Sequence, residues 1–310
     1  GSICKQGALP VMKPTLFSVS YAGLWGQTFL DVDAFVEKAA ELGYPAVELM
    51  GKRPHLSPLD AHPDRLARLR DRAAEKGVEI ATIAAYNDFT AGGPSAMIPS
   101  VEIQLTYLRA LVQCAQALDA KILRIFTGFA TGDIRHLADW NACITAVREA
   151  ADIAADHGVT LGIQNHHDVA VGLDGYSEFL DDVDHANCKA MFDPWSVALQ
   201  GDVDLRKAAK TMAPRMVQTT LADYVRLRRF AYVPGVEDYR EQAAWQRAVP
   251  LGTGDIMDLD GFMQGLKDGG FNGHVCYEMC SPLRGGGSED NLDRAATVAL
   301  EKIQSYASDA

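Results

Sequence analysis

The feature that most constrains this chain is a regular alternation of short, apolar, β-rich segments with helical segments, repeated eight times. Strict alternation predicts parallel strands joined by right-handed crossovers. Eight such units predict closure into a barrel rather than an open sheet. An open nucleotide-binding sheet typically has a GxGxxG motif after its first strand, and this chain has none there. The predicted fold class is therefore α/β, a (β/α)8 TIM barrel in a single domain.

The expected elements follow from hydrophobic spacing and from helix-ending glycines such as Gly43, Gly77 and Gly158. Asp64 is expected to cap the second helix. The predicted strands cover residues 15–21, 45–49, 79–86, 121–127, 160–165, 189–193, 215–221 and 274–279. The predicted helices cover residues 32–42, 64–76, 101–118, 140–157, 176–183, 205–212, 259–268 and 291–306.

Two segments stand outside this repeat. Residues 1–11 are interpreted as a tag or a disordered lead, so that the barrel spans residues 12–310. Residues 224–255 form a long connection between the seventh strand and its helix. This connection is too aromatic for a disordered linker. We therefore expect it to be either a lid over the site or a contact between copies in a homo-oligomer.

Composition narrows the partners and the location. The net charge of −12 argues against nucleic acid as a partner, because phosphate binding depends on many Lys and Arg contacts. No apolar run reaches 18 residues, so no membrane span is expected. The six cysteines are scattered without CxxC spacing and are interpreted as free thiols in a reducing compartment. A cytoplasmic location is therefore expected.

In a barrel of this kind the chemistry lies where the strands end. Strand alternation predicts that Gln164 and His166 face the lumen of the barrel. A carboxylate inside the lumen needs a cation, an arginine or substrate hydroxyls, and an ion pair between Glu278 and Arg124 is the structural alternative to a catalytic role. The residues expected to bind substrate are Trp25, Glu48, Asn87, Arg124, Trp195 and Arg284.

Four segments carry a resemblance to a known family: GIQNH at 162–166, MFDPW at 191–195, LGTGDI at 251–256 and YEM at 277–279. They resemble the sugar phosphate isomerase/epimerase superfamily, the xylose-isomerase-like TIM barrels. The resemblance covers nearly the whole chain from Met12. It implies one divalent cation, often manganese, bound by Glu, Asp, His and Glu at the ends of strands five to eight.

Carried over to this chain, two of those four ligands match and two do not. Asp193 and Glu278 match, whereas Gln164 replaces the first Glu and Thr220 replaces the His. The ligand charge expected from the resemblance falls from −3 to −2, and threonine is a weaker ligand than histidine. The resemblance still implies an oxygen-rich Mn²⁺ or Mg²⁺ site, with His166 or His167 as a replacement ligand.

The resemblance also implies an enzyme that moves a proton α to a carbonyl of a small carbohydrate. Gln164 cannot serve as one of two proton-carrying carboxylates, so Glu278 is the expected base, with His166 or His167 as a second group. Isomerisation or epimerisation is the first hypothesis, and a lyase acting on a keto-sugar, keto-inositol or keto-glycoside is the alternative. A non-catalytic carbohydrate-binding barrel is a further alternative. The related endonuclease for abasic DNA is not expected, because the strand-seven histidines are missing.

Overall fold

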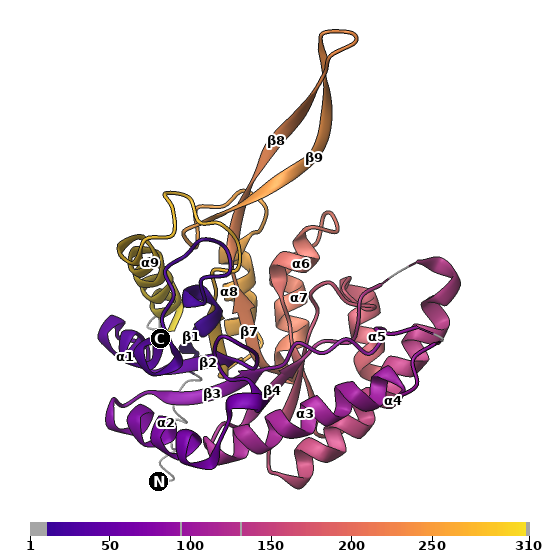
Figure 1. The fold of residues 1–310 in the computed structure, drawn as a ribbon. Helices are drawn as coiled ribbons and strands as arrows, with labels where there is room; N and C mark the ends of the chain where they lie inside the picture. The colour runs from indigo at the N-terminus through magenta and orange to yellow at the C-terminus, as the bar shows by residue number, and fades with distance from the viewer. Residues whose placement is uncertain (1–10, 94, 131, 308–310) are drawn as a thin grey trace, which may run out of the picture.

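A computed structural model describes residues 11–93, 95–130 and 132–307 of the chain. Eight parallel strands close into a barrel in the order β1-β10-β7-β6-β5-β4-β3-β2, which confirms the predicted fold (Figure 1). Closure comes from β1 pairing with β10, where Thr15 is aligned with Cys276. The strands are β1 Lys13–Phe17, β2 Ala46–Met50, β3 Glu79–Ala84, β4 Ile122–Ile125, β5 Thr160–Gln164, β6 Cys188–Met191, β7 Met216–Leu221 and β10 His274–Tyr277.

Helices surround the barrel, one after each strand. They are α1 Val32–Leu42, α2 Pro63–Glu75, α3 Ser100–Ala117, α4 His136–Asp156, α5 Leu173–Val183, α7 Leu205–Met212, α8 Leu259–Asp268 and α9 Glu289–Ala307. The main core lies between the strands and these helices, where Phe35, Phe179 and Phe262 are fully buried. Among the described residues, no helix combines the length and the apolar character that crossing a membrane requires.

Local signals explain most helix ends, with one correction. Asp31 accepts a hydrogen bond from the amide of Ala34 at the start of α1, and Gly43 ends that helix with φ 90°. The prediction that Asp64 caps α2 is wrong. The cap position is His62, which makes no side-chain hydrogen bond there, and Asp64 lies in the first turn after Pro63. Proline at the first helical position favours this earlier start.

The first strand is shorter than predicted. β1 ends at Phe17, and Ser18–Tyr21 forms the 3₁₀-helix η1. The Ser18 hydroxyl accepts a hydrogen bond from the amide of Met50, and the Ser20 hydroxyl accepts one from the amide of Met279. These serines thus satisfy one backbone amide at the end of β2 and one just beyond β10, where the chain turns across the barrel mouth. Apolar spacing does not reveal such a turn.

The long connection after β7 is not a loop, which corrects the sequence-based expectation. It is an antiparallel hairpin of β8 Asp223–Val233 and β9 Asp238–Val249, called the arm below. Figure 1 shows the arm projecting from the barrel into solvent. Because neither face of most of the arm is buried, its strands lack the alternation of apolar and polar residues that identifies a half-buried strand.

Asp223 fastens the base of the arm to the barrel. Its Oδ2 atom accepts hydrogen bonds from the amides of Gly252 and Gly254, at 2.8 and 3.0 Å. A Cβ atom at Gly254 would lie 1.8 Å from Asp223 Oδ1, so only glycine fits there. The glycine-rich segment at 251–256 therefore has a structural role in this chain.

Candidate active site

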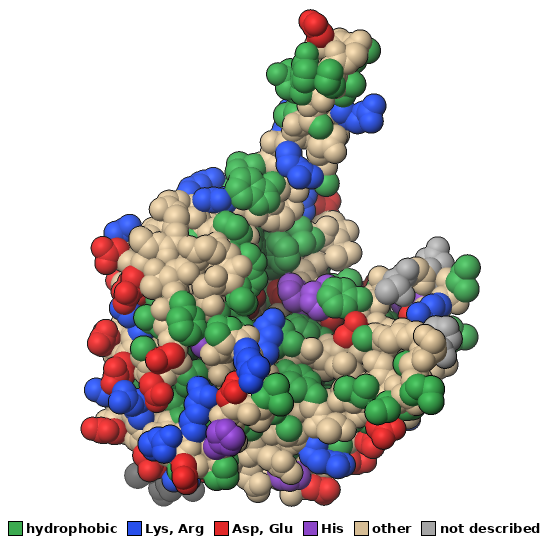
Figure 2. All heavy atoms as spheres, viewed as in Figure 1, with side chains coloured by type: hydrophobic (Ala, Val, Ile, Leu, Met, Phe, Trp, Pro, Cys, Tyr) green, Lys and Arg blue, Asp and Glu red, His purple; other side chains and the backbone are tan. Residues whose placement is uncertain are grey.

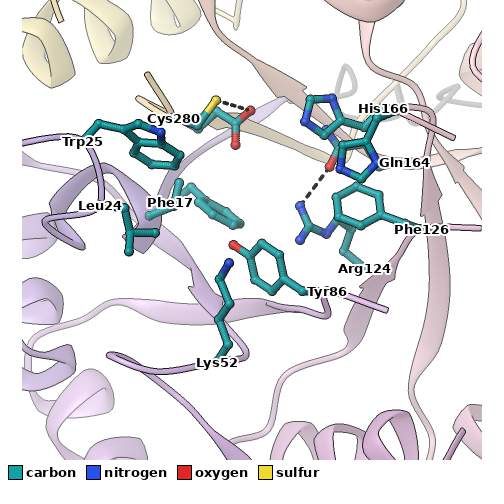
Figure 3. A pocket seen from close by; sticks show the side chains of 13 residues that line it. Phe17, Leu24, Trp25, Lys52, Tyr86, Arg124, Phe126, Gln164, His166 and Cys280 are labelled. Atoms are coloured by element: carbon teal, nitrogen blue, oxygen red, sulfur yellow. Dashed lines mark hydrogen bonds between the residues drawn. The ribbon is translucent and has the colours of Figure 1, made fainter. Parts of the chain in front are cut away.

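The candidate active site is a cavity of about 240 Å³ at the end of the barrel where the strands finish (Figure 3). Its walls come from residues at or just beyond the carboxyl ends of strands, as expected for this fold. The lining residues are Phe17, Val19, Leu24, Trp25, Lys52, Tyr86, Arg124, Phe126, Gln164, His166, His167, Glu278 and Cys280.

Gln164 joins two charged groups at the end of β5. Arg124 donates from Nη1 to Gln164 Oε1 at 3.1 Å and from Nη2 to the carbonyl of Ala85 at 2.8 Å. Gln164 in turn donates from Nε2 to Asp193 Oδ2 at 3.1 Å. The amide therefore presents its oxygen to the cation and its nitrogen to the carboxylate, and the chain Arg124–Gln164–Asp193 fixes this wall.

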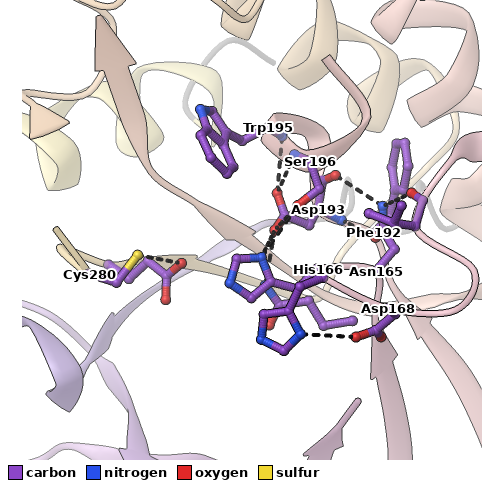
Figure 4. Close-up of polar contacts among 12 residues, drawn as sticks. Asn165, His166, Asp168, Phe192, Asp193, Trp195, Ser196 and Cys280 are labelled. Carbon is purple, nitrogen blue, oxygen red and sulfur yellow. Dashed lines mark hydrogen bonds and ion pairs between the residues drawn. The ribbon is translucent and has the colours of Figure 1, made fainter. Parts of the chain in front are cut away.

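Asp193 is buried, and donors surround both of its oxygens (Figure 4). Oδ1 accepts hydrogen bonds from the amides of Trp195 and Ser196, at 3.0 and 3.3 Å. Oδ2 accepts from Gln164 Nε2 and from the Ser196 hydroxyl, each at 3.1 Å. Asp193 thereby caps the short helix α6, Pro194–Ala198, which the sequence analysis missed although Asp followed by Pro is a helix-start signal. Burial raises its pKa to about 6.

Glu278 follows β10 and is nearly buried, with 9% of its surface exposed. The Cys280 thiol donates to its Oε1 atom at 3.5 Å, and the Tyr224 hydroxyl lies 3.0 Å from the same sulfur. Burial, followed by the charge of Asp193, raises the pKa of Glu278 to about 8. The predicted alternative of an ion pair is not present: among the described residues, Glu278 and Arg124 do not approach within the 4.0 Å of an ion pair.

His166 and His167 belong to an aromatic cluster that lines the cavity. Their ring centroids lie 4.6 Å apart, and the His167 ring stacks on Phe129 at 4.0 Å. His166 Nδ1 lies 3.5 Å from the Ser196 hydroxyl. Burial, together with the nearby positive charge of Arg124, lowers the pKa of each imidazole to about 4. Both rings are therefore neutral near pH 7.

Lys52 is a lining residue that sequence reasoning missed. It lies two positions beyond β2, and its Nζ atom is 3.9 Å from the centroid of the Tyr86 ring. Arg124 Cζ lies over the same ring at 4.8 Å and over Phe126 at 4.2 Å. Burial and the charge of Arg124 lower the pKa of Lys52. The sequence signal that could have identified Lys52 is its position just past the end of a strand, where residues of this fold reach the site.

The sequence matches the model of the family described as xylose isomerase-like TIM barrel over residues 36–302. The chain belongs to this family. None of the curated protein sequences compared with this chain matches it.

Solved structures of xylose isomerase-like barrels share the fold at low sequence identity. A D-psicose 3-epimerase from Clostridium cellulolyticum H10 has a TM-score of 0.71 and 18% identity, covering 95% of this chain and 99% of its own. The probable 3-DHS dehydratase AsbF from Bacillus anthracis has a TM-score of 0.69 and 17% identity, covering 94% and 99%. The IolI protein, with a bound zinc atom, has a TM-score of 0.73 and 15% identity, covering 96% and 100%.

The residues of this xylose isomerase-like barrel do not fit the divalent cation that the resemblance implies. Asp193 already accepts four hydrogen bonds, and the Gln164 oxygen is directed at a guanidinium group. Thr220 is neutral, although its buried hydroxyl has no partner. Among the described residues, no group of three or more His, Cys, Asp or Glu side chains is arranged to hold a metal ion. Of the four ligand positions that the resemblance implies, only Glu278 offers a carboxyl group with few hydrogen-bond donors around it.

Several predicted substrate-binding residues lie outside the cavity wall. The Asn87 side chain bonds the backbone of Phe126 with both its oxygen and its nitrogen, and so joins two strand ends. The Trp195 ring packs on Tyr224. Arg284 is exposed, and its amide donates to the carbonyl of Ala248.

Glu48 lies in the barrel lumen and does not line the cavity. Its Oε2 atom accepts a hydrogen bond from Gln218, which also accepts one from Thr82. The second carboxylate oxygen, Oε1, is buried without a partner. Burial raises the pKa of Glu48 to about 7. Of the residues predicted to bind substrate, Trp25 and Arg124 line the cavity.

Proposed function

We propose that this protein is an enzyme that moves a proton on the carbon next to a carbonyl of a small polyhydroxylated substrate, with Glu278 as the base. The observation that carries the proposal is the placement of Glu278. Among the described residues that line the cavity, it is the only acidic side chain, and the same cavity is bordered by Arg124 and Lys52. The family and its epimerase and dehydratase neighbours support an enzyme of this kind.

The chemistry begins with ionised Glu278. Its carboxylate takes the α proton, the C–H electron pair forms the new C=C bond of an enediolate, and the carbonyl π electrons move to the oxygen. Negative charge on that oxygen is stabilised by Arg124, which lies in a site where aromatic rings limit water. Glu278 returns the proton to the former carbonyl carbon, while the α hydroxyl passes its proton to the former carbonyl oxygen and becomes the new carbonyl, which completes an isomerisation.

One proton-carrying carboxylate also fits a lyase. Glu278 takes the α proton, the C–H electrons form a C=C bond, and a β-hydroxyl leaves with the proton that Glu278 returns to it, so that water is released. Gln164 occupies the place of a second carboxylate, and both imidazoles are neutral near pH 7, which disfavours two-base epimerisation. The likeness to a probable dehydratase supports this second candidate.

We propose that Arg124 supplies the positive charge that a divalent cation supplies in metal-dependent enzymes. The expectation of Mn²⁺ or Mg²⁺ rested on the resemblance, and the zinc of IolI supports a metal in that protein. In this chain the Asp193 oxygens are saturated and the Gln164 oxygen faces a cation. Metal analysis of protein purified without chelator tests this point. We expect less than about one tenth of an equivalent of divalent metal per chain, because these ligands bind such a cation weakly.

The proposed reaction is tested by incubating the enzyme with a panel of keto-sugars and keto-inositols in D₂O and following the α carbon by NMR. Deuterium at that carbon, or loss of water from the substrate, is the expected result. Saturable carbohydrate binding with neither outcome would favour the non-catalytic alternative and contradict the proposal.

We also propose that the arm contacts a second copy of this chain. Apolar side chains are exposed along both strands and the turn (Figure 2): Leu227, Phe230, Tyr232, Val236, Tyr239 and Trp245. A two-stranded ribbon in water is only marginally stable by itself, so such side chains favour a covering surface. The arm, residues 223–249, holds five arginines against four acidic residues, while the whole chain has a net charge of −12. The arm therefore complements the acidic body of another copy.

The proposed location is a reducing compartment, the cytoplasm. The cysteines that the structure describes, Cys114, Cys143, Cys188, Cys276 and Cys280, are free thiols. Proteins of oxidising compartments commonly use such residues in disulfides.

A further inference from the structure

Two cations share one side of the cavity, and among the described residues neither forms a close ion pair, although the charge of Arg124 acts at longer range on Glu48 and Glu278. Lys52 and Arg124 lie over the same Tyr86 ring, at 3.9 and 4.8 Å from its centroid. Among the described residues, no carboxylate lies within 4.0 Å of either cationic group. Two like charges that are held close together and partly shielded from water raise the free energy of the empty site. An anion bound between them would lower it.

Both cations keep donors available. A guanidinium group has five N–H bonds, and Arg124 uses one for Gln164 and one for the carbonyl of Ala85. Its Nε atom is buried without a partner. Among the described residues, no hydrogen bond or ion pair occupies Lys52 Nζ, which has only the Tyr86 ring beneath it. The fold thus holds a rigid guanidinium and a flexible ammonium group ready for one anionic group.

The opposite side of the cavity carries the base. Figure 3 shows Cys280, which hydrogen-bonds to Glu278, across the cavity from Lys52. Leu24, Trp25 and Phe17 form an apolar side between them. A ligand that spans the cavity therefore meets cations at one end and a single carboxylate at the other.

We propose that the substrate is a sugar acid, whose carboxylate binds Lys52 beside Arg124, while the remaining N–H groups of Arg124 face the carbonyl oxygen next to Glu278. This inference rests on the proposed function and names the substrate class of the same site. The cavity, about 240 Å³, matches a small molecule. Arg and Lys side chains bind both carboxylates and phosphates, but no glycine that could supply the backbone amides of a glycine-rich phosphate loop is among the described residues that line this cavity, so we favour a carboxylate.

The test compares matched pairs of ligands by isothermal titration calorimetry at low salt. The pairs are D-fructuronate with D-fructose and D-glucuronate with D-glucose, which differ only by a carboxylate in place of a CH₂OH group. D-fructose 6-phosphate provides the phosphate arm. We expect at least one acid to bind at least about tenfold more tightly than its neutral partner, the gain of one hydrogen-bonded charge pair. The phosphate ester is expected to bind more weakly than that acid.

Lys52→Met is expected to remove most of this preference while changing affinity for the neutral sugar by less than about twofold. Lys76→Met, which alters an exposed lysine at the end of α2, is the matched control and should keep the preference. Thermal unfolding of each variant verifies folding. Equal binding of acids and neutral sugars, a preference that survives in Lys52→Met, tighter binding of the phosphate ester, or no binding of any acid would each overturn the proposal.

Deuterium exchange distinguishes failure of this inference from failure of the proposed function. Exchange at the α carbon of D-fructose without exchange into D-fructuronate would overturn the sugar-acid inference and leave the proposed chemistry intact. Tight binding of the acids without exchange or elimination in any keto compound would support the anion site and contradict the chemistry.

Discussion

The mouth of the barrel and the arm differ in which side chains they bury: the mouth buries polar groups, and the arm exposes apolar ones. At the mouth, polar groups are buried and several are held by fixed donors, as Asp193 is, while others such as Glu48 Oε1 and the Thr220 hydroxyl have no partner among the described residues. Along the arm, large apolar side chains such as Tyr239 are exposed, and Tyr239 contacts only its cross-strand neighbour Tyr232 among the aromatic rings of the described residues. The mouth is a rigid, preorganised site, whereas the arm is a surface that gains from association. Chemistry and assembly are therefore expected to be separable in this molecule.

The largest expected effect is at the base. Glu278→Gln should lower the rate of α-deuterium exchange by at least about 1,000-fold, because the amide cannot accept the proton. The measurement is exchange into whichever panel compound reacts with the unmodified enzyme. Glu75→Gln, at an exposed position near the end of α2, is the matched control and should leave the rate unchanged. An unaffected rate in Glu278→Gln would remove Glu278 from the mechanism.

The barrel was predictable from sequence because its signals are local and repeated. Asp31 and Gly43 mark the ends of one helix, and apolar runs mark the strands. The arm was not predictable, since its residues bury no common face. At the site, sequence and resemblance indicated Gln164, His166, His167 and Glu278, all of which line the cavity.

Other features of the site were beyond sequence reasoning for physical reasons. Lys52 and Cys280 look like ordinary residues beyond strands, and only tertiary packing shows that they face the cavity. Asn87 and Trp195 were expected to meet substrate; in the structure the Asn87 amide bonds the backbone of Phe126, and the Trp195 ring packs on Tyr224. Strand ends turn in ways that side-chain alternation does not specify.

The second prediction concerns the cation that stabilises the enediolate. Arg124→Ala should reduce kcat by about 100-fold, the size of effect seen when one preorganised charge is removed from such a site. Guanidinium ion added at millimolar concentration should restore part of the rate, whereas Mn²⁺ should not. Rescue by Mn²⁺ alone would indicate that the site uses a metal. Circular dichroism verifies that the variant is folded.

The third prediction concerns the arm. Replacing residues 227–246 with a short Gly-Ser turn should convert a dimer into a monomer, measured as a twofold fall in mass by light scattering. Exchange activity per chain should change by less than about threefold, because the cavity residues belong to the barrel. A wild-type protein that is already monomeric, or a shortened protein that remains dimeric, would contradict the proposed contact.

The smallest expected effect is at the thiol that bonds to the base. Activity should rise with pH through a midpoint near the pKa of Glu278, about 8, because only the ionised carboxylate is a base. The hydrogen bond from Cys280 lowers the pKa of Glu278, so Cys280→Ala should move the midpoint to higher pH. Fewer Glu278 side chains are then ionised at pH 7, and the rate at that pH should fall about threefold. Cys188→Ala is the control, at a residue away from the cavity. A midpoint that stays in place or moves downward would exclude this role for Cys280.

The most direct test of the central claim is deuterium incorporation by chelator-treated enzyme. The protein is dialysed against EDTA, transferred to D₂O and given the keto-sugar and keto-acid panel, and the products are followed by NMR and mass spectrometry. A single-base reaction that relies on Arg124 predicts a full rate and one deuteron at one α carbon of the reacting compound. Loss of activity on chelation, restored by Mn²⁺ or Mg²⁺, would contradict it.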